Sequence, residues 1–286
     1  MAMFATLAKY YSDDALAKML TTAKETESTK AIATKMEGLQ ITNWLNAGDS
    51  ADDVFKTLKL EQTGGKLFEN AVFPNWVAFV AKRNTQDPEL AMFSTFARHY
   101  SDDALAKMLV AAKEVDSTRS IATKMENLQI TNWINADKSS NEVFAILKLD
   151  QAGDKLFDSP VLSTWTSFVT KVNKNNPDDV MVTQLAEKFD DVSLAKMILA
   201  AAKVERTQSL AADLRSAQFK TWFTAGRTPK YVDTMLKVGA NSDDVTKKIS
   251  RDYEKFYGKV KVTVSESTNK KVDPQGASTS TRIRTR

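Results

Sequence analysis

The sequence predicts an all-α protein made of tandem helical bundles. The string YSDDALAKML occupies positions 11–20 and returns at 100–109, an offset of 100 − 11 = 89 residues. Apolar residues recur at helical spacing in each copy, and the one clear period-two alternation is KVKVTV at 259–264. A fixed period of this length indicates modules that pack against their neighbours. We therefore expect the repeats to stack into a rigid, elongated rod.

The same offset relates the tryptophans and the apolar residues of the repeated string. All five tryptophans fall into two rows of this register. Because they lie at helical spacing with Leu, Val and Phe, we expect core packing in preference to a role as partner anchors. With the two tyrosines assigned below, the predicted motif core consists of Trp44, Trp76, Trp133, Trp165, Trp222, Tyr253, Tyr257, Leu16, Met19, Leu105, Met108, Leu194 and Met197.

The offset also sets the expected domain boundaries. We expect three modules of about five helices each, followed by a tail without periodicity. Their predicted limits are residues 1–88, 89–177, 178–262 and, for a disordered basic tail, 263–286.

The first helix of a module follows Ser12. Leu16, Met19 and Leu20 fall on one stripe, Ser12 is the expected N-cap, and the acidic pair after it suits the first turn. This repeated string is thus predicted to be a capped amphipathic helix. We expect its apolar face to seal the end of the preceding module.

The second and third helices have recognisable limits. The second is expected to begin near Ser28 and to end at Gly48. The third has an N-cap in every copy, at Ser50, Ser139 and Thr228. Three different sequences therefore predict the same helix start.

A glycine loop and two further helices complete the module. VFPNWVAFV at 72–80 predicts the fourth helix, and Asp87 and Asn176 are expected to cap the helix that leads into the next module. That connection is short and apolar, which favours rigid docking of neighbours. In the third copy the register places Glu254 where a tryptophan is expected, so we expect Tyr253, with Phe256 or Tyr257, to fill the slot.

Composition excludes several classes of protein. Lys and Arg exceed Asp and Glu by 40 − 36 = 4, and residues 265–286 hold five basic and two acidic residues, which leaves about +1 for the rest. A nucleic-acid binder normally carries a basic stripe on its folded surface, so we expect no nucleic-acid partner. The chain has no cysteine and no apolar run long enough to span a bilayer. Residues 1–11 lack the pattern of a secretion signal, and we expect a targeting segment upstream to have been removed.

The motifs resemble those of oomycete RXLR effectors. NW at 43–44 with SADDVFKTLKL at 50–60, and LFENAVFPNWVAF at 67–79, look like the W and Y motifs, and SDDALAKML looks like the L motif of tandem LWY repeats. The resemblance covers residues 1 to about 260, and the third Y motif departs from it. It implies a virulence effector that is secreted by a filamentous pathogen, enters the plant cell and suppresses immunity by binding host proteins.

The resemblance also implies a class of partner. Some tandem LWY effectors capture the scaffolding A subunit of protein phosphatase 2A, with its catalytic subunit, through two adjacent repeats. The effector then replaces a regulatory subunit, and the remaining repeat can recruit phosphoproteins. We expect the surface of repeats 1 and 2 to carry such a site, although the contact residues cannot be identified from the motifs. We expect a monomer in the host cytoplasm, with the nucleus as an alternative.

No catalytic, cofactor or metal site is expected. His99 is the single histidine; Tyr10 lies one period before it, and Phe189 lies beside the position one period after it, so no repeated general base exists. TGGKLF at 63–68 lacks the spacing of a phosphate-binding loop. We expect the protein not to be an enzyme, because nucleophile, base and orienting group cannot all be assigned.

A short linear motif offers an alternative function. Tyr257 and Val260 have the aromatic and aliphatic spacing by which proteins dock to ubiquitin-like autophagy receptors through strand addition. The pattern is common by chance, and Tyr257 is also needed for the third core. Core packing is therefore the preferred interpretation of Tyr257.

Overall fold

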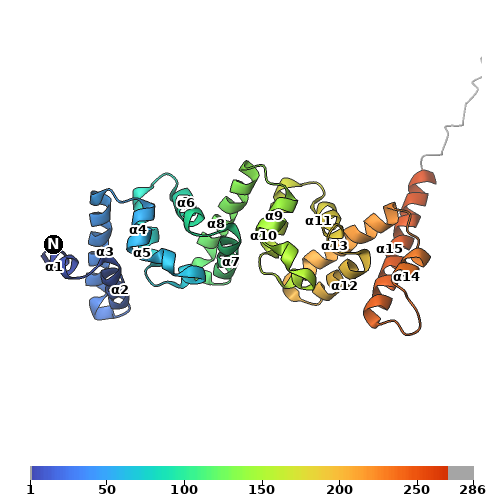
Figure 1. Ribbon diagram of the computed structural model, residues 1–286, viewed down its shortest axis with the longest axis horizontal. Coiled ribbons are helices and arrows are strands. Elements are labelled where there is room, and N and C mark those ends of the chain that lie inside the picture. The colour runs from blue at the N-terminus through green and yellow to red at the C-terminus, as the bar shows by residue number, and fades with distance from the viewer. Residues whose placement is uncertain (1, 270–286) are drawn as a thin grey trace, which may run out of the picture. The chain divides into compact units, whose positions relative to one another are not determined.

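The computed structural model describes residues 2–269, and within that range it contains helices and no strand. This confirms the predicted all-α class. The chain forms two compact units, one ending at Lys174 and the other beginning at Asn175. Unit 1 holds the first two predicted modules up to residue 174, three residues short of the predicted limit at 177, and the third module falls in unit 2 (Figure 1).

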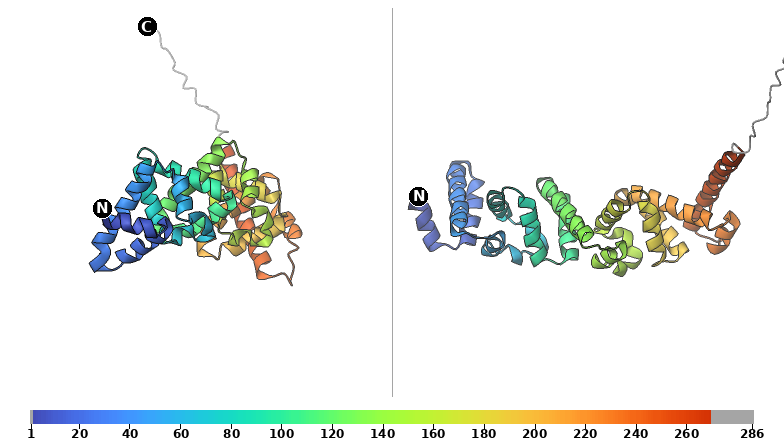
Figure 2. Two further views of the ribbon diagram at one scale, coloured as in Figure 1. Left: turned by 60° about the vertical axis from the view of Figure 1, so that its left-hand side comes forward. Right: turned by 90° about the horizontal axis from the view of Figure 1, so that it is seen from above.

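Unit 1 contains two copies of the same order of helices (Figure 2). In each copy a short helix precedes a helix pair, a third helix, two 3-10 turns and a fourth helix. The first copy comprises α1 (Ala2–Tyr10), α2 (Asp13–Lys24), α3 (Glu27–Ala47), α4 (Ala51–Thr57), η1 (Leu60–Gln62), η2 (Gly64–Glu69) and α5 (Phe73–Arg83). The second comprises α6 (Pro88–His99), α7 (Asp102–Lys113), α8 (Asp116–Asn135), α9 (Ser140–Ile146), η3 (Leu149–Gln151), η4 (Gly153–Asp158) and α10 (Leu162–Val172).

Unit 2 repeats the order in simpler form. It comprises α11 (Pro177–Ala186), α12 (Asp191–Ala201), α13 (Glu205–Thr224), α14 (Pro229–Met235) and α15 (Asp244–Asn269). Here α15 takes the place of both the second 3-10 turn and the fourth helix. This explains why the tryptophan register is lost after α14.

The predicted start of the third helix is confirmed in each copy. Ser50 and Ser139 form capping boxes with Asp53 and Glu142, and the Thr228 hydroxyl accepts a hydrogen bond from the backbone N–H of Tyr231. These bonds satisfy N–H groups that have no partner inside the helix. The cap therefore fixes where the third helix begins. In the first copy, Gly48 at φ +81° ends the second helix just before it.

A lysine in the left-handed region ends the third helix of every copy. Lys59, Lys148 and Lys237 have φ values of 55°, 56° and 55°. The Lys59 ammonium lies 3.0 Å from Asp14 of α2, and the Lys148 ammonium lies 2.8 Å from Asp103 of α7. The equivalent of these aspartates in the third copy is Val192, so this ion pair is confined to unit 1.

Three predicted ends differ from the structure. Ser12 occupies the N-cap position, but its hydroxyl bonds to the Asp14 carboxylate and not to a helix N–H. Asn176 makes no side-chain cap bond, whereas Asp87 accepts one from the backbone N–H of Leu90. Residues 263–269 belong to α15, so the predicted start of the tail at 263 is wrong. Residues 263–269 contain no glycine or proline that would end the helix. Residues 270–286 lie outside the described part.

Candidate interaction surface

The tryptophans lie in the cores of the two units, as the sequence predicted. All five are at most 2% exposed. Trp44 packs edge-on against Phe79, and its equivalent Trp133 packs in the same way against Phe168. A partner protein therefore meets other side chains, because aromatic rings buried to this extent belong to the fold.

A second aromatic row ties the fourth helix to the start of the third. The indole N–H of Trp76 donates to the Ala51 carbonyl at 2.8 Å, and that of Trp165 donates to the Ser140 carbonyl at 3.1 Å. In unit 2, Tyr253 fills this slot, as expected. Its ring is fully buried, and its hydroxyl donates to the Arg227 carbonyl at 2.5 Å.

The leucines of the first helices are also buried, but the methionines are not equivalent. Leu16, Leu105 and Leu194 are at most 1% exposed. Met108 is 5% exposed and Met197 is half-buried, whereas Met19 is 40% exposed. The prediction that Met19 lies in the core is wrong. Met108 belongs to a core cluster that it shares with residues of the first copy, and the described residues place no such cluster over Met19.

The core of repeat 1 continues into α6, α7 and the first half of α8 in repeat 2. The helix α6, which begins the second copy, inserts Phe93 and Phe96 between the helices of the first. The Phe96 ring centroid lies 5.4 Å from that of Trp76 and 6.1 Å from that of Phe55. The Tyr100 hydroxyl then donates to the Leu60 carbonyl at 3.2 Å. The two repeats therefore present their surfaces as one body.

A polar cluster covers the edge of this shared core. His99 Nε2 of α6 lies 2.6 Å from Asp52 Oδ1 of α4, and the His99 ring stacks on Phe55 with centroids 5.1 Å apart. The Lys56 ammonium also lies 2.7 Å from Asp52. Its hydrogen bond is the main reason that the pKa of Asp52 lies below the usual value, and the bond to His99 acts in the same direction.

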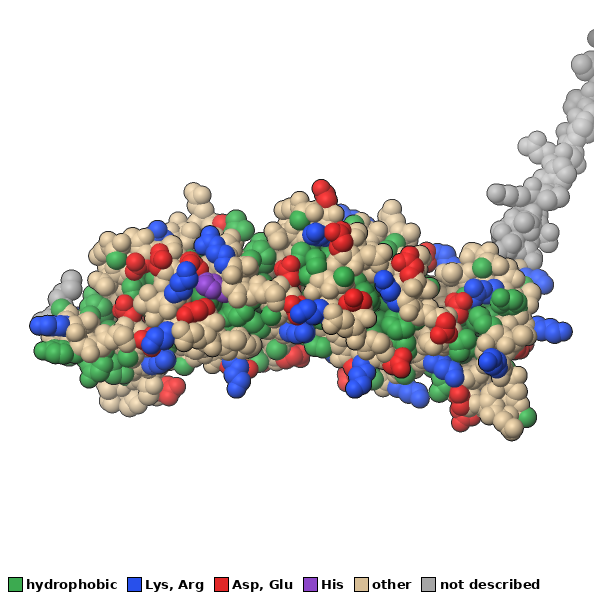
Figure 3. Space-filling view, viewed as in Figure 1, with side chains coloured by type: hydrophobic (Ala, Val, Ile, Leu, Met, Phe, Trp, Pro, Cys, Tyr) green, Lys and Arg blue, Asp and Glu red, His purple; other side chains and the backbone are tan. Residues whose placement is uncertain are grey.

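Two exposed cations flank this cluster, one from each repeat. Lys56 lies on α4 of the first repeat and Arg98 on α6 of the second, and both side chains are exposed. We call the surface formed by Asp52, Lys56, Arg98 and His99 the junction face. An exposed Arg side chain at such a position suits recognition of carboxylate groups on a partner. On the side drawn in Figure 3, basic and acidic side chains are interspersed over unit 1.

Sequence reasoning did not identify the junction face, although the register held a signal for it. The positions one period later in the sequence are Asn141, Ala145, Glu187 and Lys188. A surface whose charges change between copies is free of the packing constraint that keeps core positions alike. Comparison of exposed positions between copies would therefore have marked Lys56 and Arg98.

The alternative motif lies in a helix. Tyr257 and Val260 both belong to α15, and the Tyr257 ring packs edge-on against Phe223 with centroids 5.2 Å apart. Strand addition needs an extended backbone, which α15 could supply only by unwinding. The half-buried Tyr257 thus serves the third core.

The described residues offer no other obvious centre for chemistry. Between residues 2 and 269 no group of three His, Asp or Glu side chains is placed to hold a metal ion. Over the same range no helix has both the length and the apolar character that a membrane crossing requires. His99, the single histidine of the chain, is a packed residue between two repeats.

Comparison with known proteins places this architecture among described effectors. The family model described as "Effector PexRD54, WY-domain" matches residues 39–80 and 128–169, two segments 128 − 39 = 89 residues apart. The chain is 33% identical over 247 residues to RxLR effector protein PSR2 of Phytophthora sojae. That alignment covers 85% of this chain and 37% of PSR2, so the chain spans well under half of that relative.

A shorter relative and a solved structure agree with this similarity. RxLR effector protein PexRD25 of Phytophthora infestans is 31% identical over 220 residues, which cover 75% of this chain and 71% of PexRD25. The crystal structure of PcRxLR12 aligns with a TM-score of 0.80 at 36% identity, over 91% of this chain and 65% of PcRxLR12. The resemblance expected from the W, Y and L motifs is thereby confirmed.

Proposed function

The chain belongs to the RxLR effectors built from WY domains, and from that premise we propose that it acts inside plant cells as a non-catalytic scaffold for host proteins. In this proposal repeats 1 and 2 capture the scaffolding A subunit of protein phosphatase 2A in place of a regulatory subunit. The captured enzyme then removes phosphate from proteins of the immune response. The protein would reach the host cytoplasm after secretion by the pathogen.

The observation that supports this proposal is that the core of repeat 1 continues into α6, α7 and α8 of repeat 2. Capture by a pair of adjacent repeats requires that the pair hold a fixed geometry, because ordering two loose modules would reduce affinity. Phe93 and Phe96 pack inside the first repeat, and the Tyr100 hydroxyl and His99 bond to its third-helix region. The junction face crosses this boundary and supplies a cation from each repeat.

The proposal is tested by affinity purification of the tagged chain from plant tissue, followed by mass spectrometry. A matched variant carries Lys56→Ala and Arg98→Ala, two exposed positions whose truncation should leave the fold intact. We expect the phosphatase scaffolding and catalytic subunits with the wild-type chain and a clear loss with the variant. Recovery of other host proteins without a phosphatase subunit would contradict phosphatase capture and would indicate another host target.

A further inference from the structure

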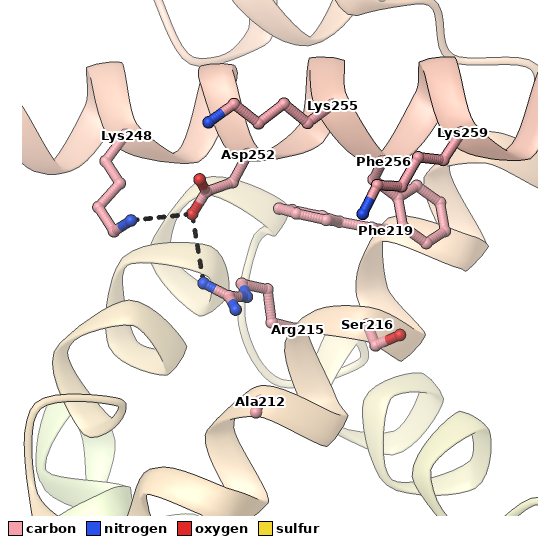
Figure 4. A pocket seen from close by; sticks show the side chains of 9 residues that line it. All are labelled: Ala212, Arg215, Ser216, Phe219, Lys248, Asp252, Lys255, Phe256 and Lys259. Atoms are coloured by element: carbon pink, nitrogen blue, oxygen red, sulfur yellow. Dashed lines mark hydrogen bonds and ion pairs between the residues drawn. The ribbon is translucent and has the colours of Figure 1, made fainter.

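Unit 2 contains a groove between α13 and α15 (Figure 4). It has a volume of about 350 Å³ and is open to solvent. We call it the third-repeat groove. The side chains that line it and enter the argument are Arg215, Phe219, Lys248, Asp252, Lys255 and Lys259.

The charges of the third-repeat groove are unbalanced. Its single carboxylate, Asp252, lies 3.2 Å from both Arg215 and Lys248. In Figure 4 dashed lines mark these two contacts, whereas Lys255 and Lys259 extend from α15 without an acidic partner among the residues drawn. Four cations and one carboxylate give the lining a formal charge of 4 − 1 = +3.

The groove also has an apolar floor. Phe219 and Phe256 lie 5.8 Å apart between ring centroids, and Phe256 is half-buried beside the cations of the lining. Exposed aromatic surface between cations can accept an aliphatic side chain of a ligand and strengthen charge pairs by excluding water.

Repeats 1 and 2 carry a different charge pattern at the same place. The register puts Glu37 and Glu126 where the third copy has Arg215. Each of these glutamates is neutralised by a lysine of the preceding helix, Lys24 or Lys113, at 2.6 Å. The third copy has Ala202 at that lysine position. Its own cation at this place, Arg215 of α13, instead contacts Asp252 of α15 in the groove.

The fourth helix shows the same change. Because Tyr253 takes the place of Trp165, the fourth helix of the third copy is offset from that of the second by 253 − 165 = 88 residues. This offset aligns Lys255 with Ser167 and, in the first copy, with Ala78. Lys259 aligns with Lys171 and Lys82, so that cation is common to all copies. The excess positive charge is therefore a property of the third copy and does not follow from the shared fold.

We propose that the third-repeat groove binds an acidic peptide segment, rich in Asp and Glu, of a partner protein. Lys248 and Lys259 are 259 − 248 = 11 residues apart on α15, a rise of roughly 16 Å, which is too long for one phosphate group. An extended peptide places carboxylates along such a length and can set an aliphatic side chain on Phe256 between them. The four cations of the lining belong to a single groove, which is smaller than the broad basic footprint of a nucleic-acid binder. This inference does not depend on which host protein repeats 1 and 2 capture.

The test uses the full chain and fluorescein-labelled 12-residue peptides of Glu and Leu, with Gln or Lys replacing Glu in two controls. Fluorescence anisotropy should show saturable binding of the Glu peptide only, weakening as salt rises because the contacts are ionic. The variant K255E with K259E should lower the affinity at least about tenfold. The matched variant K82E with K171E reverses two lysines in repeats 1 and 2 and should leave the affinity unchanged.

Three results would overturn the proposal. One is the absence of saturable binding by the Glu peptide, and another is an equal loss of affinity in both double variants when circular dichroism shows both to be folded. The third is tighter binding of a single-stranded oligonucleotide of equal charge, which would assign the groove to nucleic acid. None of these results bears on phosphatase capture, because the groove lies in unit 2.

Discussion

His99 Nε2 lies 2.6 Å from Asp52 Oδ1, a contact that joins α6 of the second repeat to α4 of the first. Both side chains are 16% exposed. The His99 ring also stacks on Phe55, whose other face belongs to the shared core. The contact therefore couples the surface of the junction to its interior.

Replacement of His99 by Ala should destabilise unit 1 by about 1 to 2 kcal/mol, since it removes a hydrogen bond and an aromatic contact. Chemical denaturation followed by circular dichroism measures the change. Lys56→Ala removes the more exposed partner of Asp52 and should leave the midpoint almost unchanged. Equal effects of the two substitutions would contradict the role given to His99.

The two tryptophans of the first repeat should respond differently to replacement by Phe. The Trp76 indole N–H donates to the Ala51 carbonyl at 2.8 Å, whereas the buried Trp44 N–H has no partner. Trp76→Phe loses a hydrogen bond, and Trp44→Phe relieves an unsatisfied donor. We expect Trp76→Phe to cost about 1 kcal/mol more, measured as the difference in unfolding free energy. A larger cost for Trp44→Phe would show that ring volume dominates at both sites.

Met108 and Met19 form a matched pair, because they occupy the same place in an identical ten-residue string. Met108 is buried against the first repeat and Met19 is exposed. Met108→Ala should therefore cost about 2 to 4 kcal/mol and Met19→Ala well under about 1 kcal/mol. Thermal unfolding of both variants checks this difference. Similar costs would mean that the string is stabilised by local packing alone.

Acid should weaken the ion pair between Asp103 of α7 and Lys148, the residue with positive φ that follows α9. The hydrogen bond from Lys148 is the main cause that lowers the pKa of Asp103 from 3.8 to about 2. A depressed carboxylate pKa contributes stability above the unfolded value, and that stability is lost as pH falls from about 4 towards 2. Asp103→Asn should lower stability at pH 7 by about 1 kcal/mol and flatten the acid slope. Asp154→Asn, at an exposed position, is the control and should change neither.

The sequence predicted the repeated interior well because the same packing problem recurs three times. The caps at Ser50 and Ser139 and the place of Tyr253 followed from local chemistry and from register. Met19 was misplaced because burial in this fold depends on a neighbouring repeat, which an identical string cannot reveal. The junction face was missed because its signal is a change of charge between copies, whereas the sequence was searched for residues that recur.

The most direct test of the account is the binding of the purified chain to a purified plant phosphatase 2A scaffolding A subunit, measured by isothermal titration calorimetry. We expect a 1:1 complex with a dissociation constant of about 1 µM or below. Lys56→Ala with Arg98→Ala should weaken it at least about tenfold, and K255E with K259E should not. Absence of binding to the wild-type chain, or an affinity indifferent to the junction face but dependent on Lys255 and Lys259, would contradict capture by repeats 1 and 2.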